Sequence, residues 1–334
     1  MPPMRSASPG RHMRRRRAAL AAGIITALTA SSVLVTPAAY AEEVSTLTPF
    51  EAVDPFIGTQ MNDANNGRGN DHYGNTFPGA TVPFGMVQSS PTTYSTTLGE
   101  QFGGYEHSAD QIRGFGMTRL SGTGCRPRYS GFDFPVLPYT QTLTDGGLPT
   151  NPTTSITDYF LDFSHEDEVT EPGYYSVALD TGVDVELPST TRPAVSRYAF
   201  ADGVPATLVI DAAGSNNDVS ASEISYDPAT RTLSGTVTSK IVCASGPEYT
   251  AHFSATFDAP VESYGTWDAD SVDAAGTTAS ATTQKHGSGA WLTFADGADV
   301  TATVGLSYVS VEGAQANANA EVGSATFEDV RAQA

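Results

Sequence analysis

A cluster of ionisable side chains occurs where the sequence reads His165-Glu166-Asp167-Glu168. Imidazoles and carboxylates are the groups that act as general acids and bases, and a pair of carboxylates can cleave a glycosidic bond. Adjacent residues, however, rarely converge on one substrate. We therefore predict a solvated turn before Pro172-Gly173 in preference to a catalytic pair.

Oxygen-bearing side chains also recur in the polar, Gly/Asn-rich residues 60–74, as Asp63, Asn65 and Asp71. Such side chains can bind a cation, but their spacing lacks the terminal bidentate acid of a calcium loop. A flexible surface loop is the favoured interpretation, with cation binding as the alternative.

The sequence has two cysteines, Cys125 and Cys243. In an exported protein they could form a disulfide. The alternative is two buried free thiols, because the sequence alone does not place their Cα atoms within bonding range. Both interpretations stay open.

These groups must be positioned by the elements around them, and the segment from Gly74 to Leu137 is the one most interrupted by glycine and proline. Such residues mark tight turns and close backbone approaches. The segment is either a loop-rich meander in a β protein or a site-forming region whose side chains reach a polar ligand.

Residues 1–41 have the pattern of a secretory signal peptide: four arginines from Arg14, an apolar stretch from Ala18 to Val35, and Ala39-Tyr40-Ala41 before two acids. Cleavage predicts a secreted, extracellular protein. It removes six arginines and no acids, so the net charge changes from −20 to about −26. So acidic a chain is not expected to bind nucleic acid or an anionic membrane surface, and no later apolar run is long enough to span a bilayer.

Apolar and polar residues alternate from about residue 174 onward, most clearly from Tyr249 to Phe257 and from Val300 to Tyr308. Leu208-Val209-Ile210 is a short apolar run that we expect to be buried. Period-two strands separated by turn residues, with no βαβ rhythm, predict antiparallel sheets. The fold class is therefore all-β, a sandwich or a barrel.

The pattern changes after this β region, which we place at residues 48–312. Residues 313–334 are rich in alanine and predict the start of a helical linker. Thr326-Phe327-Glu328-Asp329 predicts a capping box that opens a second helix. Because that helix would begin close to Ala334, we expect further chain after it.

A series of short motifs runs through residues 50–334: Val53-Asp54-Pro55-Phe56-Ile57-Gly58-Thr59, Gly74-Asn75-Thr76-Phe77-Pro78-Gly79-Ala80, Val82-Pro83-Phe84-Gly85-Met86-Val87-Gln88, Gly104-Tyr105, Ile112-Arg113-Gly114-Phe115, Leu120-Ser121-Gly122-Thr123-Gly124-Cys125, Pro172-Gly173-Tyr174-Tyr175, Tyr264-Gly265-Thr266-Trp267 and Val304-Gly305-Leu306-Ser307-Tyr308-Val309-Ser310-Val311-Glu312. Each motif is weak alone. In this order and spacing they resemble the start of family 92 glycoside hydrolases, secreted exo-acting α-mannosidases.

The resemblance implies an antiparallel β-supersandwich of the galactose-mutarotase-like type, joined by a short helical linker to an (α/α)6 barrel that this chain lacks. It also implies a calcium ion that helps bind mannose, a glutamic acid as general acid and an aspartate that activates water, giving inversion. Those groups belong mostly to the barrel. No catalytic residue and no metal ligand of this chain is carried over, so the fragment alone is expected to be inactive.

The family's sandwich contributes loops to the substrate pocket, which makes Asn75, Tyr105, Arg119 and the loop Ser121-Gly122-Thr123-Gly124-Cys125 the candidates for binding a mannose-containing glycan. Local structural roles are the alternatives: Asn75 capping a turn, Arg119 pairing with Asp133, and Cys125 buried or bridged. The family commonly has histidine where this chain has Arg119. Arg126 and Arg128 also depart from its pattern, which puts the linkage specificity in doubt and could favour an anionic mannoside.

Three functions compete. The favoured one is the N-terminal, substrate-pocket-contributing domain of a secreted, calcium-dependent, inverting exo-α-mannosidase. The alternative is a stand-alone carbohydrate-binding module, in which Trp267 and Trp291 would stack on sugars instead of packing in the core. A structural or adhesive surface domain ranks last.

Overall fold

The computed structural model describes residues 47–60, 74–94, 103–121, 131–240 and 247–334. The signal peptide, most of the polar loop of residues 60–74, Gly122, both cysteines and Arg126 and Arg128 lie outside the described residues. The predictions made for them, including the disulfide between Cys125 and Cys243, stay predictions. In the motif from Val53 to Thr59, residues 55–58 form a turn.

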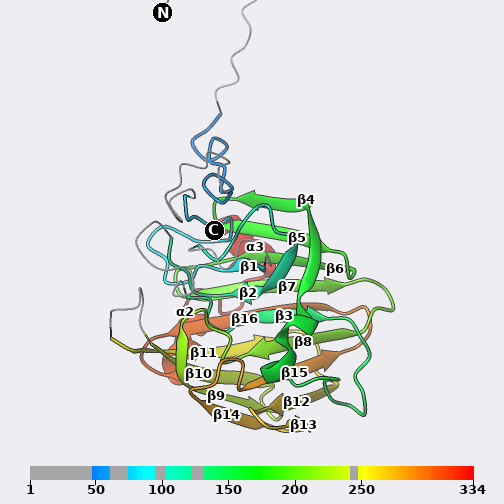
Figure 1. Cartoon of the computed structure of the whole chain (residues 1–334). Coiled ribbons are helices and arrows are strands. Elements are labelled where there is room, and N and C mark those ends of the chain that lie inside the picture. The colour runs from blue at the N-terminus through cyan, green and yellow to red at the C-terminus, as the bar shows by residue number, and fades with distance from the viewer. Residues whose placement is uncertain (1–46, 61–73, 95–102, 122–130, 241–246) are drawn as a thin grey trace, which may run out of the picture. The chain divides into compact units, whose positions relative to one another are not determined.

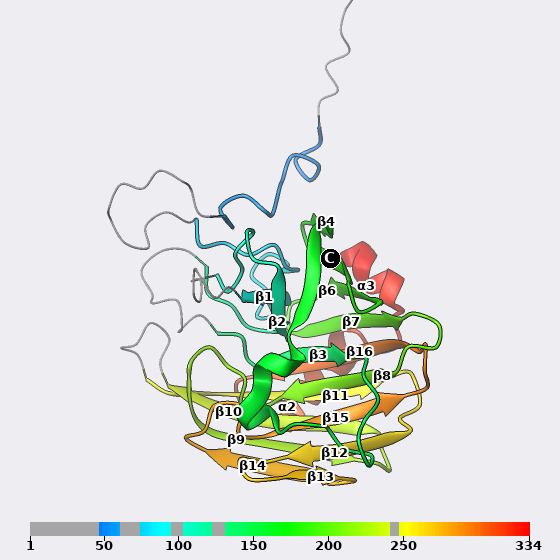
Figure 2. The ribbon, with the colours of Figure 1, turned by 45° about the vertical axis from the view of Figure 1, so that its right-hand side comes forward.

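Within the described residues, sixteen strands pair in antiparallel fashion along one continuous path, which divides at β4 into two sheets (Figures 1 and 2). The first sheet has the order β13 (Val272–Ala274), β12 (Ser263–Trp267), β15 (Gly289–Phe294), β8 (Ala206–Asp211), β3 (Val136–Tyr139) and β2 (Gln111–Gly116), with β1 (Ser90–Tyr94) also pairing with β2.

The second sheet has the order β4 (Leu161–Glu171), β5 (Tyr174–Leu179), β6 (Val183–Pro188), β7 (Pro193–Phe200), β16 (Asp299–Ser307), β11 (Tyr249–Phe257), β10 (Thr232–Lys240), β9 (Asp218–Asp227) and β14 (Thr278–Thr282). Strand β4 pairs with β2 at one end and with β5 along the rest of its length, so it joins the two sheets.

The main hydrophobic core lies between the two sheets. Alternation brings one face of each strand inward, as in β11, where Ala251 and Phe253 are buried. Rings from the two sides meet there: Phe134 and Phe253 have centroids 4.6 Å apart, and Phe257 and Phe294 have centroids 5.9 Å apart. This arrangement confirms the predicted antiparallel β-sandwich.

The first sheet also buries its outer face. Every residue of β8 is buried, which confirms the expectation for Leu208-Val209-Ile210. Residues 140–160, including the helix α1 (Pro152–Ser155) and the 3₁₀ helix η2 (Ile156–Tyr159), cover that face with Leu148 and Tyr159. Beneath them lie Trp267 and Trp291.

The two tryptophans are 1% and 0% exposed. Both belong to the cluster under residues 140–160, and Trp267 Nε1 donates a hydrogen bond to the carbonyl of His286 at 3.0 Å. The hypothesis that Trp267 and Trp291 stack on sugars is therefore wrong. Two indoles of this size bury more apolar area as core than any surface position would allow.

The prediction of a solvated turn at residues 165–168 is also wrong. These residues lie within β4, and Glu168 is buried. The register of β4 against β5 passes from Phe163–Leu179 to Glu168–Val177, so β4 carries extra residues between the two pairs. A bulge of this kind breaks the alternation that sequence reasoning relies on and redirects side chains.

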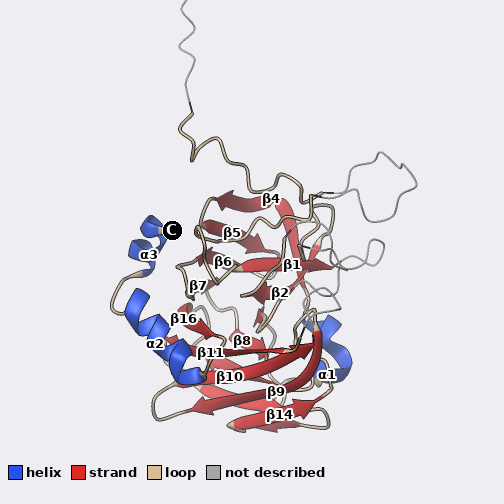
Figure 3. Ribbon diagram, turned by 90° about the vertical axis from the view of Figure 1, so that its left-hand side faces the viewer, coloured by secondary structure: helices blue, strands red, loops and turns tan. Residues whose placement is uncertain are grey.

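Two helices pack on the outer face of the second sheet, on the side opposite α1 (Figure 3). The first, α2 (Val311–Glu321), is capped by Ser310 and lies so close to β16 that a Cβ on Gly305 would be 1.9 Å from the carbonyl oxygen of Ala314. The second, α3 (Phe327–Gln333), has the predicted capping box between Thr326 and Asp329. No helix among the described residues is both long and apolar enough to cross a membrane.

Two arginines fix α3 to the sheet. The guanidinium of Arg197, from β7, lies 3.7 Å from the ring centre of Phe327 and also bonds Glu328. That of Arg331 lies 3.8 Å from the ring centre of Tyr174. Cation–π contacts of this kind contribute about 0.5–2 kcal/mol.

We expect Arg197→Ala to loosen α3 without unfolding the sandwich. Losing about 1.4 kcal/mol of contact corresponds to roughly tenfold faster amide exchange over residues 327–333. Hydrogen–deuterium exchange measured by mass spectrometry checks this. Arg231→Asn, in an exposed turn with φ 54° that asparagine tolerates, should leave exchange in α3 unchanged; equal exchange in both variants would contradict the proposed anchoring.

Candidate functional site

A pocket of about 320 Å³ surrounds Arg119 and is formed by four segments that are distant in the sequence. The first follows β2, the second joins β8 to β9, the third is the start of β11 and the fourth follows β16. We call it the Arg119 pocket; its lining residues are Thr118, Arg119, Leu120, Gly131, Asn217, Pro247, Glu248, Tyr249 and Tyr308.

Arg119 is buried and is the cationic side chain of the described pocket lining. Its Nη2 donates a hydrogen bond to the carbonyl of Ser90, and its guanidinium lies 4.9 Å from the ring centre of Phe132. Its Nε and Nη1 have no hydrogen-bond partner among the described residues. Burial, aided by Arg113, lowers the pKa of Arg119 to about 9, so the group is still a cation at neutral pH.

A network of side-chain hydrogen bonds behind the pocket holds Tyr249 in place. Its hydroxyl donates to Asp133 Oδ2 at 2.8 Å and accepts from Asn217 Nδ2 at 2.8 Å. Thr118 Oγ1 donates to the same Asp133 oxygen at 2.8 Å. Burial raises the pKa of Asp133, against the effect of its hydrogen bonds and of the Arg119 charge.

The backbone around Asp133 is held in an unusual conformation. Phe132 and Phe134, its two neighbours, have φ values of 74° and 54°, a region that bulky residues rarely adopt. Such strain persists only where the surroundings hold the chain in place, and it concentrates at functional sites. The Asp133 carboxylate is thereby fixed under Tyr249.

Two tyrosines form the aromatic edge of the pocket. Tyr308 is half-exposed, and its ring packs edge-on against Tyr249 with centroids 6.0 Å apart. Aromatic faces beside a guanidinium and an amide suit a polyhydroxylated ligand, since the rings cover C–H groups while the polar atoms bond hydroxyls. Asp133, however, lies behind the lining residues, with Oδ2 bonded to Thr118 and Tyr249, and Glu248 is an exposed carboxylate. Among the described lining residues there is no pair of free carboxylates of the kind that hydrolysis of a glycosidic bond needs.

Three of the predicted site residues lie around Gly103-Gly104-Tyr105. A Cβ on Gly103 would lie 2.3 Å from the carbonyl oxygen of Thr76, so the backbone after Asn75 packs directly on it. A Cβ on Gly104 would lie 2.9 Å from Arg119 Nη1. The structure therefore brings Asn75, Tyr105 and Arg119 to one region.

Their surroundings nevertheless differ. Arg119 lines the pocket, whereas Asn75 is buried and has a left-handed backbone conformation with φ 53°. The hydroxyl of Tyr105 points away to Glu168, at 2.7 Å from its Oε2. Ser121 is exposed. The alternative partner suggested for Arg119, Asp133, attracts it electrostatically, while the hydrogen bonds of that carboxylate come from Thr118 and Tyr249.

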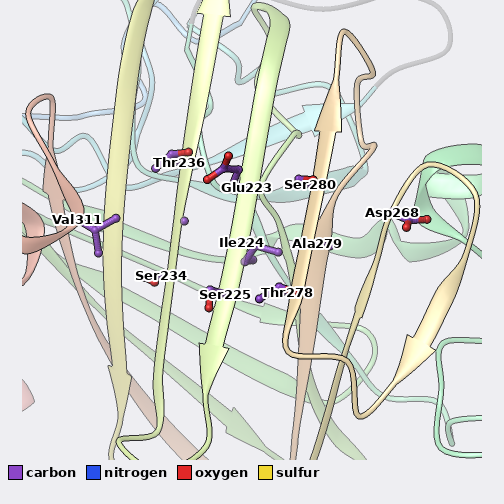
Figure 4. Close-up of a pocket in the computed structure, with 11 residues that line it drawn as sticks. Glu223, Ile224, Ser225, Ser234, Thr236, Asp268, Thr278, Ala279, Ser280 and Val311 are labelled. Atoms are coloured by element: carbon purple, nitrogen blue, oxygen red, sulfur yellow. The ribbon is translucent and has the colours of Figure 1, made fainter.

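A second hollow, of about 440 Å³, lies on the outer face of β9, β10 and β14 (Figure 4). Its walls are mostly hydroxyl-bearing side chains such as Ser225, Ser234 and Thr278. None of its lining residues is aromatic, and Glu223 is its one charged side chain on the sheet. It therefore has fewer side chains that could recognise a ligand than the Arg119 pocket has.

Comparison with known proteins agrees with this architecture. The family profile described as the glycosyl hydrolase family 92 N-terminal domain matches residues 52–307. A solved family 92 α-mannosidase from Bacteroides thetaiotaomicron, in complex with mannoimidazole, is 27% identical with a TM-score of 0.67, over 84% of this chain and 35% of that one. An inverting mannosidase of the same family and organism is 26% identical with a TM-score of 0.66, over 84% of this chain and 34% of that one.

A curated protein from Arthroderma benhamiae, named as an uncharacterised secreted glycosidase, is 27% identical over 148 residues, which are 44% of this chain and 17% of that protein. The chain thus spans about a third or less of the length of these relatives. The fold and the matches define an N-terminal β-sandwich domain of a glycoside hydrolase. The chain belongs to glycosyl hydrolase family 92.

Sequence reasoning missed Asn217, Tyr249 and Tyr308. Tyr249 was assigned to the face of a strand, and Tyr308 to a motif, with no role for either ring. The sequence signal that could have indicated a binding role was the position of both tyrosines at strand ends, where loops begin. Only the pairing of β11 with β16 shows that these ends are neighbours.

Proposed function

We propose that this chain is the sandwich part of a secreted exo-α-mannosidase and that the Arg119 pocket contributes to binding the mannoside. The observation that supports this most directly is a pocket that combines a buried guanidinium, a fixed amide and two tyrosines, within or next to the residues that the family profile matches. Hydrolysis with inversion would require carboxylates from a further domain, so the chain by itself is expected to bind and not to hydrolyse.

Exposed apolar side chains support a second domain as partner. Phe84 is fully exposed although its backbone is held at φ 61°, and Ile57 and Val309 are also largely exposed. A phenylalanine held out of the core in an unfavourable conformation is typical of a residue that packs against another surface. An (α/α)6 barrel joined through α2 and α3 is the partner we propose.

Calcium does not fit the described residues well. It takes six to eight oxygen ligands. Within the described part of the chain, the group of potential ligands close enough to share an ion is His107, His165 and Glu168, which offers two nitrogens. We therefore assign the calcium of the complete enzyme mainly to residues of the barrel.

Secretion rests on the signal-peptide pattern and on a relative that is named as secreted. It is tested by expressing the full chain and sequencing the N-terminus of the protein recovered from the medium. We expect that N-terminus to be Glu42. A chain that is retained in the cell with residues 1–41 intact would contradict it.

The binding proposal predicts that the secreted chain binds methyl α-mannoside weakly, in the millimolar range of a partial site, and releases no mannose from an aryl α-mannoside. Calorimetry and a mannose-release assay check the two parts. Tyr308→Ala should weaken binding several-fold through loss of the aromatic edge. Tyr264→Ala, which alters a tyrosine outside the pocket, is the matched control. Turnover by the chain alone, or equal binding by both variants, would contradict the proposal.

A further inference from the structure

Four side chains converge next to the bulge of β4. Tyr105 and His107 come from the turn before β2, while His165 and Glu168 come from the bulge itself. We call these four residues the His107 cluster. It is reached from solvent, since the side chain of His165 is 27% exposed, whereas that of Glu168 is 0% exposed.

The oxygen and nitrogen atoms of these four side chains lie close to one another. Glu168 Oε2 lies 2.6 Å from His165 Nδ1 and 2.7 Å from the Tyr105 hydroxyl. That hydroxyl is 3.2 Å from His165 Nδ1 and 3.4 Å from His107 Nδ1. The ligand atoms of the two histidines and Glu168 all lie within 4.8 Å of one another.

These separations are close to those of a small tetrahedral ion. Ligands about 2.0–2.1 Å from zinc stand about 3.4 Å apart in a tetrahedron. The distances from the Tyr105 hydroxyl to the two imidazoles already have this value. The contact between His165 and Glu168 would open by less than about 1 Å, which a rotation of the exposed imidazole can supply.

The surroundings orient the carboxylate as a metal ligand requires. Glu168 Oε1 accepts a hydrogen bond from the buried Tyr175 hydroxyl at 2.5 Å, which leaves Oε2 directed at the cluster. Second-shell bonds of this kind fix ligating carboxylates in metal sites.

A purely structural network explains only part of this geometry. Tyr105, Tyr175 and His165 together satisfy the buried carboxylate of Glu168. They satisfy Glu168 without His107, whose ring stacks on His165 with centroids 4.1 Å apart and whose Nδ1 lies 3.4 Å from the Tyr105 hydroxyl. Two imidazole nitrogens facing one carboxylate are expected when a cation is shared among them.

We propose that His107, His165 and Glu168, with the Tyr105 hydroxyl beside them, form a binding site for a divalent transition-metal ion of the zinc class. Two imidazole nitrogens and one carboxylate suit zinc and its neighbours and do not suit calcium or magnesium. The site lies between β4 and the turn before β2, so a bound ion would link the bulge that joins the two sheets to the segment leading to Arg119.

The test uses the secreted full chain, stripped with a chelator and titrated with Zn²⁺ in a calorimeter. We expect one equivalent to bind with micromolar or better affinity, and Ca²⁺ not to compete. Co²⁺ in place of Zn²⁺ should give visible absorption bands of a four-coordinate site. Failure of the chain to bind either ion would overturn the proposal.

Variants assign the site. His107→Ala and His165→Ala should each lower the zinc affinity more than the roughly 10–100-fold that outer-shell changes cost, and Tyr175→Phe should fall within that range. His252→Ala, on a different strand, is the matched control and should leave the affinity unchanged. Circular dichroism confirms that each variant is folded. Full zinc affinity in both the His107 and His165 variants would overturn the proposal, whatever the outcome of the mannoside experiments.

Discussion

Alanine in place of Gly289 is expected to destabilise the sandwich by about 3 kcal/mol or more. The added Cβ would lie 2.1 Å from two ring carbons of Trp267, far inside van der Waals contact. The indole has nowhere to move, because it is 1% exposed and its Nε1 is hydrogen-bonded to the carbonyl of His286. Either the ring or the pairing of β12 with β15 must give way.

The packing of Trp267 on Gly289 has a counterpart in the same pair of strands. In the register of β12 and β15, Gly265 is opposite Trp291 and Trp267 is opposite Gly289. A Cβ on Gly265 would likewise lie 2.1 Å from a ring carbon of Trp291. Each indole therefore covers the glycine of the facing strand, and Gly265→Ala should have an effect of similar size.

Chemical denaturation followed by tryptophan fluorescence measures the effect. Gly147→Ala is the matched control: it lies near the same Trp291, but its Cβ would have nothing closer than 3.6 Å, and we expect a change within about 0.5 kcal/mol. Adding Trp267→Leu to Gly289→Ala should cost less than the sum of the two single changes, because the smaller side chain relieves the clash. Equal stability of the Gly289 and Gly147 variants would show that the strands move apart freely.

The second sheet was largely predictable, because its strands bury one face and expose the other. Tyr249 to Phe257 alternates along its whole length and is β11. The helices after Ser310 were predictable as well, since alanine content and a capping box act locally. The burial of Trp267 and Trp291 was not, because it depends on residues 140–160 folding back over the first sheet.

Arg119 and Tyr105 were among the predicted site residues, but the way in which each candidate site is assembled was not predictable from the sequence, for two different reasons. The Arg119 pocket joins residues from four segments, and only strand pairing brings Tyr249 and Tyr308 together. The His107 cluster depends on a bulge, which cancels the period of two at the residues that matter. A run such as His165 to Glu168 then has the composition of a solvated turn even though its last residue is buried.

Arg119→Met is expected to weaken mannoside binding by about 10–100-fold. Hydrogen bonds to a charged donor contribute about 1.5–3 kcal/mol, and every 1.4 kcal/mol is a factor of ten. Arg119 Nε and Nη1 are buried donors without a partner among the described residues, so a sugar hydroxyl that reached either atom would recover the cost of burying it. Methionine keeps an unbranched apolar side chain and removes the charge and all the guanidinium donors.

Calorimetry with methyl α-mannoside measures the change, and thermal unfolding of the same samples separates binding from folding. The variant will lose some stability, because Nη2 also bonds Ser90 and the guanidinium covers Phe132. Arg119→Lys should bind with intermediate affinity, since a lysine keeps the charge but not the planar set of donors. Arg231→Asn, which removes an exposed arginine outside the pocket, should bind as the unmodified chain does. A lower Tm with an unchanged mannoside affinity in Arg119→Met would mean that the buried guanidinium only stabilises the segment around Asp133. The sugar would then have to be bound elsewhere on the sandwich.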